Sequence, residues 1–293
     1  MSENWRMGSA ATLVAGLLLC FSGTAAAQGG GGAAAGAAAN SSLNKTIGRD
    51  KSPTNAENSL ELIRPPDHQE ESAFRSFQTV SAEDPKKKIE LGEAFLRKYG
   101  SSQYRSPVYS ALTAAYLETN QVQKMEEAGE KEIALNPKDV QVLAMLGQTL
   151  PRTMTPATPE PDKRLDKAEQ YAKRAIEGVP TLQKPGDMTD GQFVNAKNQT
   201  LAIAHSGLGL VNFHRGKYAD AIAELNQSVK LAPRLDPVNY YVLGVANHNA
   251  SHFAEAATAF GKCAEFQGSM QATCKDSAEK DTKAAAAQPI SPK

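Results

Sequence analysis

The sequence has no excess of charge of either sign, few aromatic residues and few cysteines. Its 32 lysine and arginine residues balance 32 aspartate and glutamate residues, which argues against a nucleic-acid-binding protein that works through bulk positive charge. Aromatic residues make up 6% of the chain, and its one tryptophan is Trp5. Because the chain is rich in alanine and poor in aromatic residues, its composition favours helices over a β-sheet.

A long hydrophobic run is also missing. The main apolar segment spans residues 13–21, which is shorter than the about 20 residues of a transmembrane helix. Arg6 precedes this segment and Ala25-Ala26-Ala27 follows it, an order typical of a secretory signal peptide. We therefore predict a signal peptide over residues 1–27 and export to the periplasm or the extracellular space. An uncleaved signal that anchors the chain in the membrane is the alternative, and beyond export we expect no membrane contact.

Two further segments lack the apolar residues that a core requires. Residues 29–39 contain only glycine and alanine, and the following stretch up to residue 67 is polar. Such a composition predicts a disordered linker over residues 28–67. We expect a second flexible segment at the end of the chain, over residues 284–293.

The rest of the chain contains an internal repeat. Two stretches match at a constant separation of 35 residues. The matching pairs are Leu208/Leu243, Gly209/Gly244, Asn212/Asn247, Gly216/Ser251, Tyr218/Phe253, Ala221/Ala256, Leu225/Phe260 and Ser228/Cys263. Each stretch predicts two amphipathic helices joined by a short turn, at Gly216-Lys217 in the first and Ser251-His252 in the second, with small residues where the two helices approach each other. Repetition at such a period indicates an array of stacked helix pairs.

The pattern Leu208-Gly209, Gly216, Tyr218, Ala221 and Pro233 resembles the tetratricopeptide repeat. The resemblance implies an all-α fold, a right-handed superhelix of helix pairs, over residues 68–268, of an exported bacterial type. It predicts an earlier unit with its turn at Asn120. It also predicts a unit split by an insertion over Pro151–Arg164, whose four prolines favour a mobile surface loop.

Both ends of the array have recognisable signals. Asp84 and Pro85 predict the start of a helix in a leading pair, because aspartate caps and proline suits the first turn. Residues 269–283 predict a polar helix after the last unit. Repeat arrays need such an end with a polar outer face, so we expect this segment to be a C-terminal capping helix.

The mature chain would keep two of the three cysteines, because Cys20 lies in the predicted signal peptide. Cys263 falls on the packing side of the last repeat and Cys274 falls in the capping helix. Adjacent antiparallel helices can bring such positions within disulfide reach, and an oxidising compartment would preserve the bond. We predict a Cys263–Cys274 disulfide, with two buried thiols as the alternative.

The motifs of catalysis and metal binding are missing. The sequence has no Gly-x-Ser-x-Gly elbow and no Cys-x-x-Cys pair. Among its five histidines, His248 and His252 are four apart, but no glutamate lies between them in the zinc-protease arrangement and His252 falls in a predicted turn. We therefore expect a protein that is not an enzyme and that uses no cofactor and no metal.

The resemblance implies a concave groove lined by the first helix of each pair, which would bind a peptide or protein segment. Its mixture of aromatic, aliphatic and neutral polar groups suits an uncharged partner. The lining residues that we predict are Leu210, Phe213, His214, Tyr241, Val245, His248 and Asn249. The hypothesis is a non-catalytic exported scaffold that binds a protein partner of unknown identity and no nucleic acid. The alternative is an envelope-assembly or chaperone-like factor that acts on unfolded clients.

Overall fold

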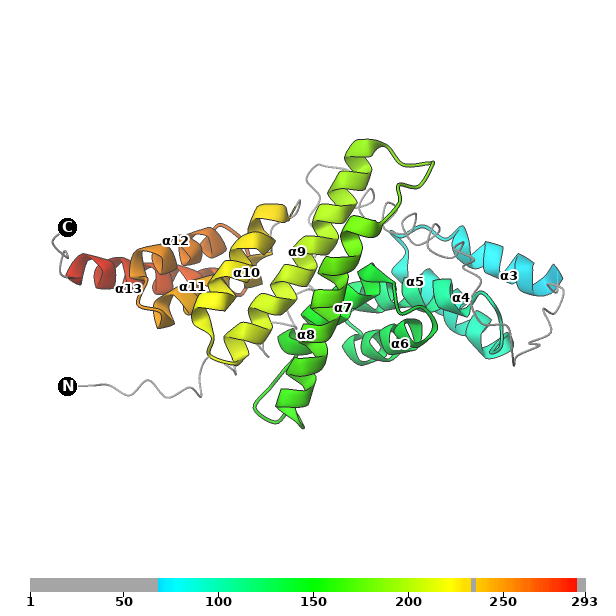
Figure 1. Ribbon diagram of the computed structural model, residues 1–293, viewed down its shortest axis with the longest axis horizontal. Helices are drawn as coiled ribbons and strands as arrows, with labels where there is room; N and C mark the ends of the chain where they lie inside the picture. Colours follow the sequence, from blue (N-terminus) through cyan, green and yellow to red (C-terminus); the bar gives the residue numbers. More distant parts are fainter. Residues whose placement is uncertain (1–67, 233–235, 289–293) are drawn as a thin grey trace. The chain divides into compact units, whose positions relative to one another are not determined.

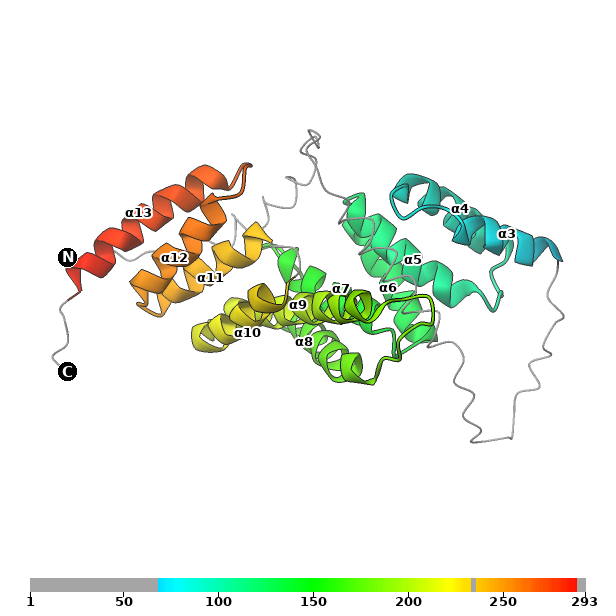
Figure 2. The same cartoon turned by 90° about the horizontal axis from the view of Figure 1, so that it is seen from above.

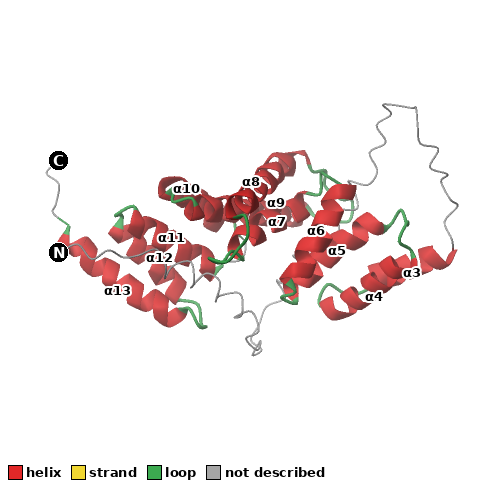
Figure 3. Ribbon diagram, turned by 90° about the horizontal axis from the view of Figure 1, so that it is seen from below, coloured by secondary structure: helices red, strands yellow, loops and turns green. Residues whose placement is uncertain are grey.

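The computed structural model describes residues 68–232 and 236–288 (Figure 1). The predicted signal peptide and linker, and the last residues of the predicted tail, lie outside these ranges. Within them every regular element is helical, as Figure 3 shows. This part of the chain forms two compact units. The N-terminal unit comprises residues 68–142 and 180–196, and the C-terminal unit comprises residues 143–179 and 197–288.

The N-terminal unit is built from antiparallel helices that pack in sequence order. Helix α3 contacts α4, α4 contacts α5, and α5 contacts α6. Asp84 begins α4 as predicted, since its side chain accepts a hydrogen bond from the Lys87 N–H at 3.0 Å. The unit contains α3 (His68–Gln78), α4 (Pro85–Lys98), α5 (Arg105–Glu118), α6 (Val122–Leu135) and the first turns of α7 (Val140–Arg152) and α9 (Asp190–His214).

The C-terminal unit continues the same construction. Helices α10, α11, α12 and α13 contact one another in chain order, and Figure 2 shows α11, α12 and α13 side by side. Besides the rest of α7 and α9, the unit holds α8 (Pro161–Gly178), α10 (Tyr218–Leu231), α11 (Pro237–Asn249), α12 (Phe253–Ala264) and α13 (Gln271–Ala287). A short 3₁₀ turn, η2 (Val179–Thr181), follows α8.

Three turns between paired helices share one geometry. Asn120, Gly216 and Ser251 have left-handed φ angles of 57°, 70° and 62°. In each turn the next residue donates its N–H to the carbonyl five residues back, at 2.8, 2.9 and 2.9 Å. This is the Schellman arrangement, which ends one helix and reverses the chain into the next. It confirms the predicted turns at all three positions.

Small residues mark the places where helices cross closely. A Cβ on Gly209 would lie 2.6 Å from Leu225 Cγ, and one on Gly244 would lie 2.7 Å from the Phe260 ring. Distances below 3.0 Å are sterically forbidden, so only glycine fits without a shift. Gly147 makes the corresponding approach to α8, because its Cβ would lie 2.9 Å from the backbone of that helix. The split unit is therefore a true helix pair, α7 with α8.

The prediction of a mobile loop over Pro151–Arg164 was wrong at both ends. Helix α7 continues through Pro151 in its last turn, and Arg164 already belongs to α8. Met154 is buried, and Arg164 Nε donates to the Leu150 carbonyl at 2.9 Å. Proline is tolerated because α7 ends one residue later, so little helix is lost.

The capping helix is longer than predicted. Helix α13 ends at Ala287 and not at Lys283, so the first residues of the expected flexible tail are helical. Alanine-rich ends continue a helix readily because alanine has the highest helix propensity.

Candidate protein-binding face

The first helices of the C-terminal pairs carry almost no charge. Helix α11 contains no lysine, arginine, aspartate or glutamate, and the part of α9 in this unit contains only Lys197. Within the same unit, α7 contributes Arg152, whose Nη1 lies 2.6 Å from Asp236 Oδ2. The second helices carry the charges, as α8 does along its length. The surface formed by the first helices therefore presents neutral groups.

Two of the predicted groove residues lie in the core. Leu210 is 0% exposed and Tyr241 is 7% exposed, both within one hydrophobic cluster. The Tyr241 ring packs 5.7 Å from the Phe260 ring, centroid to centroid. Their side chains fill the space between helix pairs, so they offer no surface to a peptide. The prediction that Leu210 and Tyr241 line a groove is corrected accordingly.

Phe213 and Val245 lie at the boundary between core and surface. Both are partly buried and pack against the same hydrophobic cluster. Phe213 contacts the Tyr218 ring at a centroid distance of 6.0 Å. These side chains are held in place by the core while part of each remains exposed, which is the form that an anchoring contact takes.

His214 sits beside Phe213 and is fixed by the end of α7. Its Nε2 lies 2.9 Å from the Pro151 carbonyl oxygen. A carbonyl only accepts, so we assign the proton to Nε2. Burial lowers the pKa of His214, which keeps the imidazole neutral at pH 7. Its neutral ring adds a polar but uncharged group to the face.

His248 and Asn249 are the exposed members of the predicted set. His248 Nδ1 lies 2.6 Å from Asp281 Oδ1, and the Asp281 side chain is only 3% exposed. The ring also contacts Phe253, at a centroid distance of 5.5 Å. His248 thus joins α11 to the capping helix while its other side faces outward. Sequence reasoning missed Asp281, because a carboxylate in a polar helix looks like an ordinary surface residue.

A chain of buried hydrogen bonds holds the first helices in register. Gln148 Nε2 donates to Ser206 Oγ at 2.9 Å, and Ser206 Oγ donates to Asn239 Oδ1 at 2.7 Å. Asn239 Nδ2 donates to Ser228 Oγ at 3.1 Å, and Ser228 Oγ donates to the Ala202 carbonyl at 2.8 Å. Four helices, α7, α9, α10 and α11, are joined through neutral groups alone. A satisfied buried network of this kind specifies one arrangement of the helices.

An ion-pair cluster ties α8 to the end of α9. Arg215 Nη1 lies 2.5 Å from Glu169 Oε2, and Arg215 Nη2 lies 2.6 Å from Asp166 Oδ1. Hydrogen bonds from Lys173 and then Arg215 lower the pKa of Glu169 to about 2. The cluster therefore links the end of α9, next to His214, to α8.

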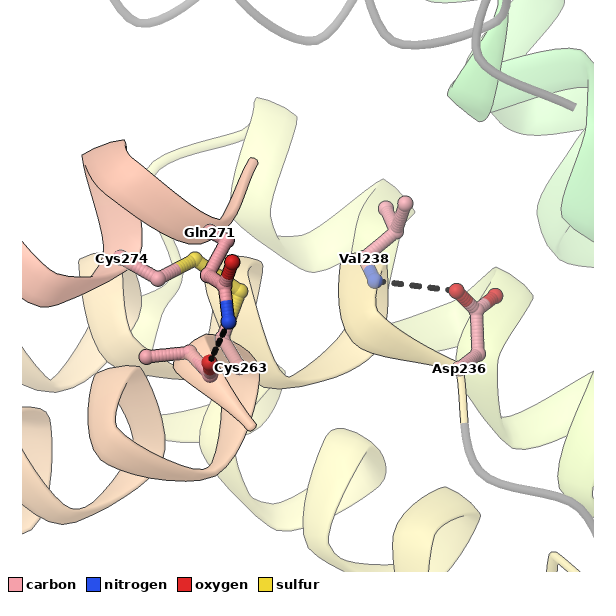
Figure 4. Close-up of a disulfide and its surroundings, with 6 residues drawn as sticks. Asp236, Val238, Cys263, Gln271 and Cys274 are labelled. Atoms are coloured by element: carbon pink, nitrogen blue, oxygen red, sulfur yellow. Dashed lines mark hydrogen bonds between the residues drawn. A yellow bond between two sulfur atoms is a disulfide. The ribbon is translucent and has the colours of Figure 1, made fainter. Parts of the chain in front are cut away.

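The predicted cysteine pair is present. Cys263 of α12 and Cys274 of α13 have sulfur atoms 2.03 Å apart and Cα atoms 5.8 Å apart, as Figure 4 shows. Both cysteines are buried in the same cluster as Tyr241. The bond attaches the capping helix to the last repeat.

The described residues assemble no metal cluster of three or more histidine, cysteine or acidic side chains. His205 is mostly buried, and its Nδ1 lies 2.7 Å from Glu224 Oε2. Over residues 68–232 and 236–288, no helix has the length and hydrophobicity needed to cross a membrane.

No protein-family model and no curated protein matches the sequence. Among solved structures, the chain is similar to the crystal structure of a thermophilic tetratricopeptide repeat protein from Thermus thermophilus. The two share 19% sequence identity, the match covers 74% of this chain and 99% of that chain, and the TM-score is 0.42. This likeness carries no information about ligands or partners.

The fold follows from the protein's own geometry. The three equivalent turns, the glycine contacts between paired helices and the sequential packing of α3 to α6 and of α10 to α13 are the features of stacked helix pairs. The described part of the chain therefore has a tetratricopeptide-like fold of stacked helix pairs.

Proposed function

We propose that this protein is a non-catalytic, exported scaffold that binds an uncharged segment of another protein on the α9–α11 face. The binding residues would be Phe213, His214, Val245, His248 and Asn249. Helical repeat folds of this type mediate protein–protein contacts, which supports the general role. The finer assignment rests on one observation, the lack of charge on the first helices of the C-terminal unit.

The neutral face favours one class of partner. A segment with many charges would lose its hydration on this surface without gaining opposite charges. An apolar segment gains contact with Phe213 and Val245, and its backbone can hydrogen-bond to the imidazole and amide groups nearby. Because Phe213 and Val245 already pack against the core, little entropy of these side chains is lost on binding.

Export is the second part of the proposal. It is supported by the charged start, apolar core and Ala25-Ala26-Ala27 ending of the sequence. Protein purified from a native-like host should begin at Gln28 when its N-terminus is sequenced. A chain that begins at Met1 and stays in the cytosol would contradict export, but it would not contradict the binding proposal.

Binding is tested by chemical cross-linking and co-purification of the exported chain, with mass spectrometry to identify what it captures. Asn249→Arg places a charge on the exposed face and should reduce capture at least tenfold. Asn195→Arg is the matched control, because Asn195 is an exposed asparagine near the start of α9, in the other unit. Equal capture by both variants would contradict the assignment of this face.

The identity of the captured proteins separates the two functional classes. One partner in stoichiometric amount supports a scaffold. Many unfolded clients in small amounts would instead support the chaperone-like alternative, with Phe213→Ala reducing all of them together.

A further inference from the structure

The N-terminal unit buries two carboxyl groups that no part of the proposed binding function uses. Glu132 of α6 is 1% exposed, and Asp139, just before α7, is 0% exposed. Acidic side chains are almost never fully buried without a compensating partner.

Hydroxyl and backbone groups surround the pair. Ser106 Oγ donates to Glu132 Oε1 at 2.8 Å, and Ser110 Oγ, one turn later on α5, donates to Asp139 Oδ2 at 2.8 Å. Asp139 Oδ1 also accepts the N–H groups of Gln141 and Val142, both at 3.1 Å, and so begins α7. The site thus joins three helices of the N-terminal unit.

The donors are divided unequally between the two acids. Asp139 accepts three hydrogen bonds, whereas Oε2 of Glu132 is buried without a hydrogen-bond partner. An ionised Glu132 would therefore hold a charged oxygen with no donor beside a second negative charge, which is strongly unfavourable. A proton on Glu132 removes both penalties.

The electrostatic environment agrees with this assignment. Burial and then the charge of Asp139 raise the pKa of Glu132 to about 8, and burial raises the pKa of Asp139 as well. The groups that act on the pair from α5, α6 and α7 are each other, the serine hydroxyls, Asn136 and backbone N–H groups. Among the described residues, no lysine, arginine or histidine contributes to either shift.

The corresponding site in the C-terminal unit shows the contrast. Ser228 occupies the position of Glu132, since each lies twelve residues after its left-handed turn residue. Ser228 makes only neutral hydrogen bonds. Asp236, which caps α11 as Asp139 caps α7, faces the cation of Arg152. Only the N-terminal site places acid beside acid.

We propose that Glu132 and Asp139 share one proton and form a pH-sensitive latch that holds α5, α6 and the start of α7 together while the proton is bound. The folded state keeps this proton to a higher pH than the unfolded chain does. The contribution to stability is therefore complete below the ordinary glutamate pKa and declines as the pH rises to about 8. Above that value it changes no further.

The first test is hydrogen–deuterium exchange of the full chain between pH 5 and pH 9, with rates corrected for intrinsic exchange. Local opening of residues 105–142 should increase by up to about tenfold per pH unit and level off near pH 8. Glu132→Gln should abolish this slope. Glu127→Gln, which removes an exposed carboxylate from the same helix, should keep it. The same slope in wild type and Glu132→Gln would overturn the proposal.

The second test reads the proton directly. In protein labelled with ¹³C-glutamate, one carboxyl signal should titrate near pH 8, persist in Glu127→Gln and disappear in Glu132→Gln. If Glu132→Gln fails to fold, Asp139→Asn serves instead, because asparagine can still cap α7 through its carbonyl oxygen. It should move that titration to lower pH by removing the neighbouring charge. Absence of any glutamate that titrates above pH 7 in wild type would refute the latch.

Discussion

In both the N-terminal and the C-terminal unit, the residue twelve positions after a left-handed turn residue connects its helix to the next helix along the chain. The chemistry of that connection differs between the two units. Glu132, Ser228 and Cys263 are buried, and each lies twelve residues after a left-handed turn residue. Each reaches the start of the following helix. Glu132 meets Asp139, whereas Cys263 bonds to Cys274.

The difference shows what a repeat junction can be used for. A disulfide holds the capping helix regardless of pH, and a neutral hydrogen bond, as at Ser228, depends little on either pH or redox state. A carboxyl pair depends on a proton. The fold requires only that this position be buried and joined to the next helix, so the chemistry there is free to vary.

The largest effect should come from breaking the core around the disulfide junction. Tyr241→Ala removes a buried ring that packs on Phe260 in the cluster containing both cysteines. We expect a loss of about 3–5 kcal/mol in the free energy of unfolding. Urea denaturation measures this loss. An unchanged unfolding midpoint with reduced partner binding would return Tyr241 to the binding face.

Removing the disulfide should cost less. A double change, Cys263→Ser with Cys274→Ser, releases the covalent link across eleven residues, with an expected loss of about 2–3 kcal/mol. Thermal unfolding with and without reductant provides the measurement, and reduced wild type should approach the variant. Two free thiols per chain in denatured, unreduced protein would show that the bond does not form.

Breaking the neutral hydrogen bonds of Ser228 should lower the free energy of unfolding less than either of the two preceding changes. Ser228→Ala removes the donor to the Ala202 carbonyl and the acceptor for Asn239, with an expected cost of about 1–2 kcal/mol. This loss should be the same at pH 5 and pH 9, since no titrating group belongs to the network. A loss that varies strongly with pH would remove the contrast with Glu132.

The smallest expected effect is an increase in stability. Ser251 holds a φ of 62°, which glycine adopts without strain, as Gly216 does in the preceding unit. Ser251→Gly should therefore stabilise the chain by about 0.5–1 kcal/mol, measured by urea denaturation. Ala250→Gly is the control, because its φ of −83° requires no glycine and the change should destabilise.

Local signals in the sequence predicted most of the fold. The separation of 35 residues between Gly209 and Gly244 placed both helix pairs and their turns, because close helix crossings need small residues at fixed intervals. Parity of the cysteines predicted the Cys263–Cys274 pair, which the structure contains. The prediction of a loop from Pro151 onward was wrong, because the last turn of a helix tolerates a proline that the middle of a helix does not.

The candidate face was predicted only in part. Spacing placed Phe213, His214, Val245, His248 and Asn249 on the surface of the first helices, and the structure agrees that each is at least partly exposed. The same spacing also assigned Leu210 and Tyr241 to that surface, but in the structure both side chains are buried. Helical spacing gives a direction from the helix axis, but the depth of a residue depends on how closely the neighbouring helix approaches.

The sequence by itself determined the helix pairs, their turns and the positions at which they cross, since these follow from residue size and backbone preference within one repeat. Only the tertiary structure decided which polar residues would be buried together. Glu132 and Asp139, or His248 and Asp281, look like surface groups along the chain. Their roles appear only when packing removes water from them, because the cost of a charge depends on its surroundings and not on its place in the sequence.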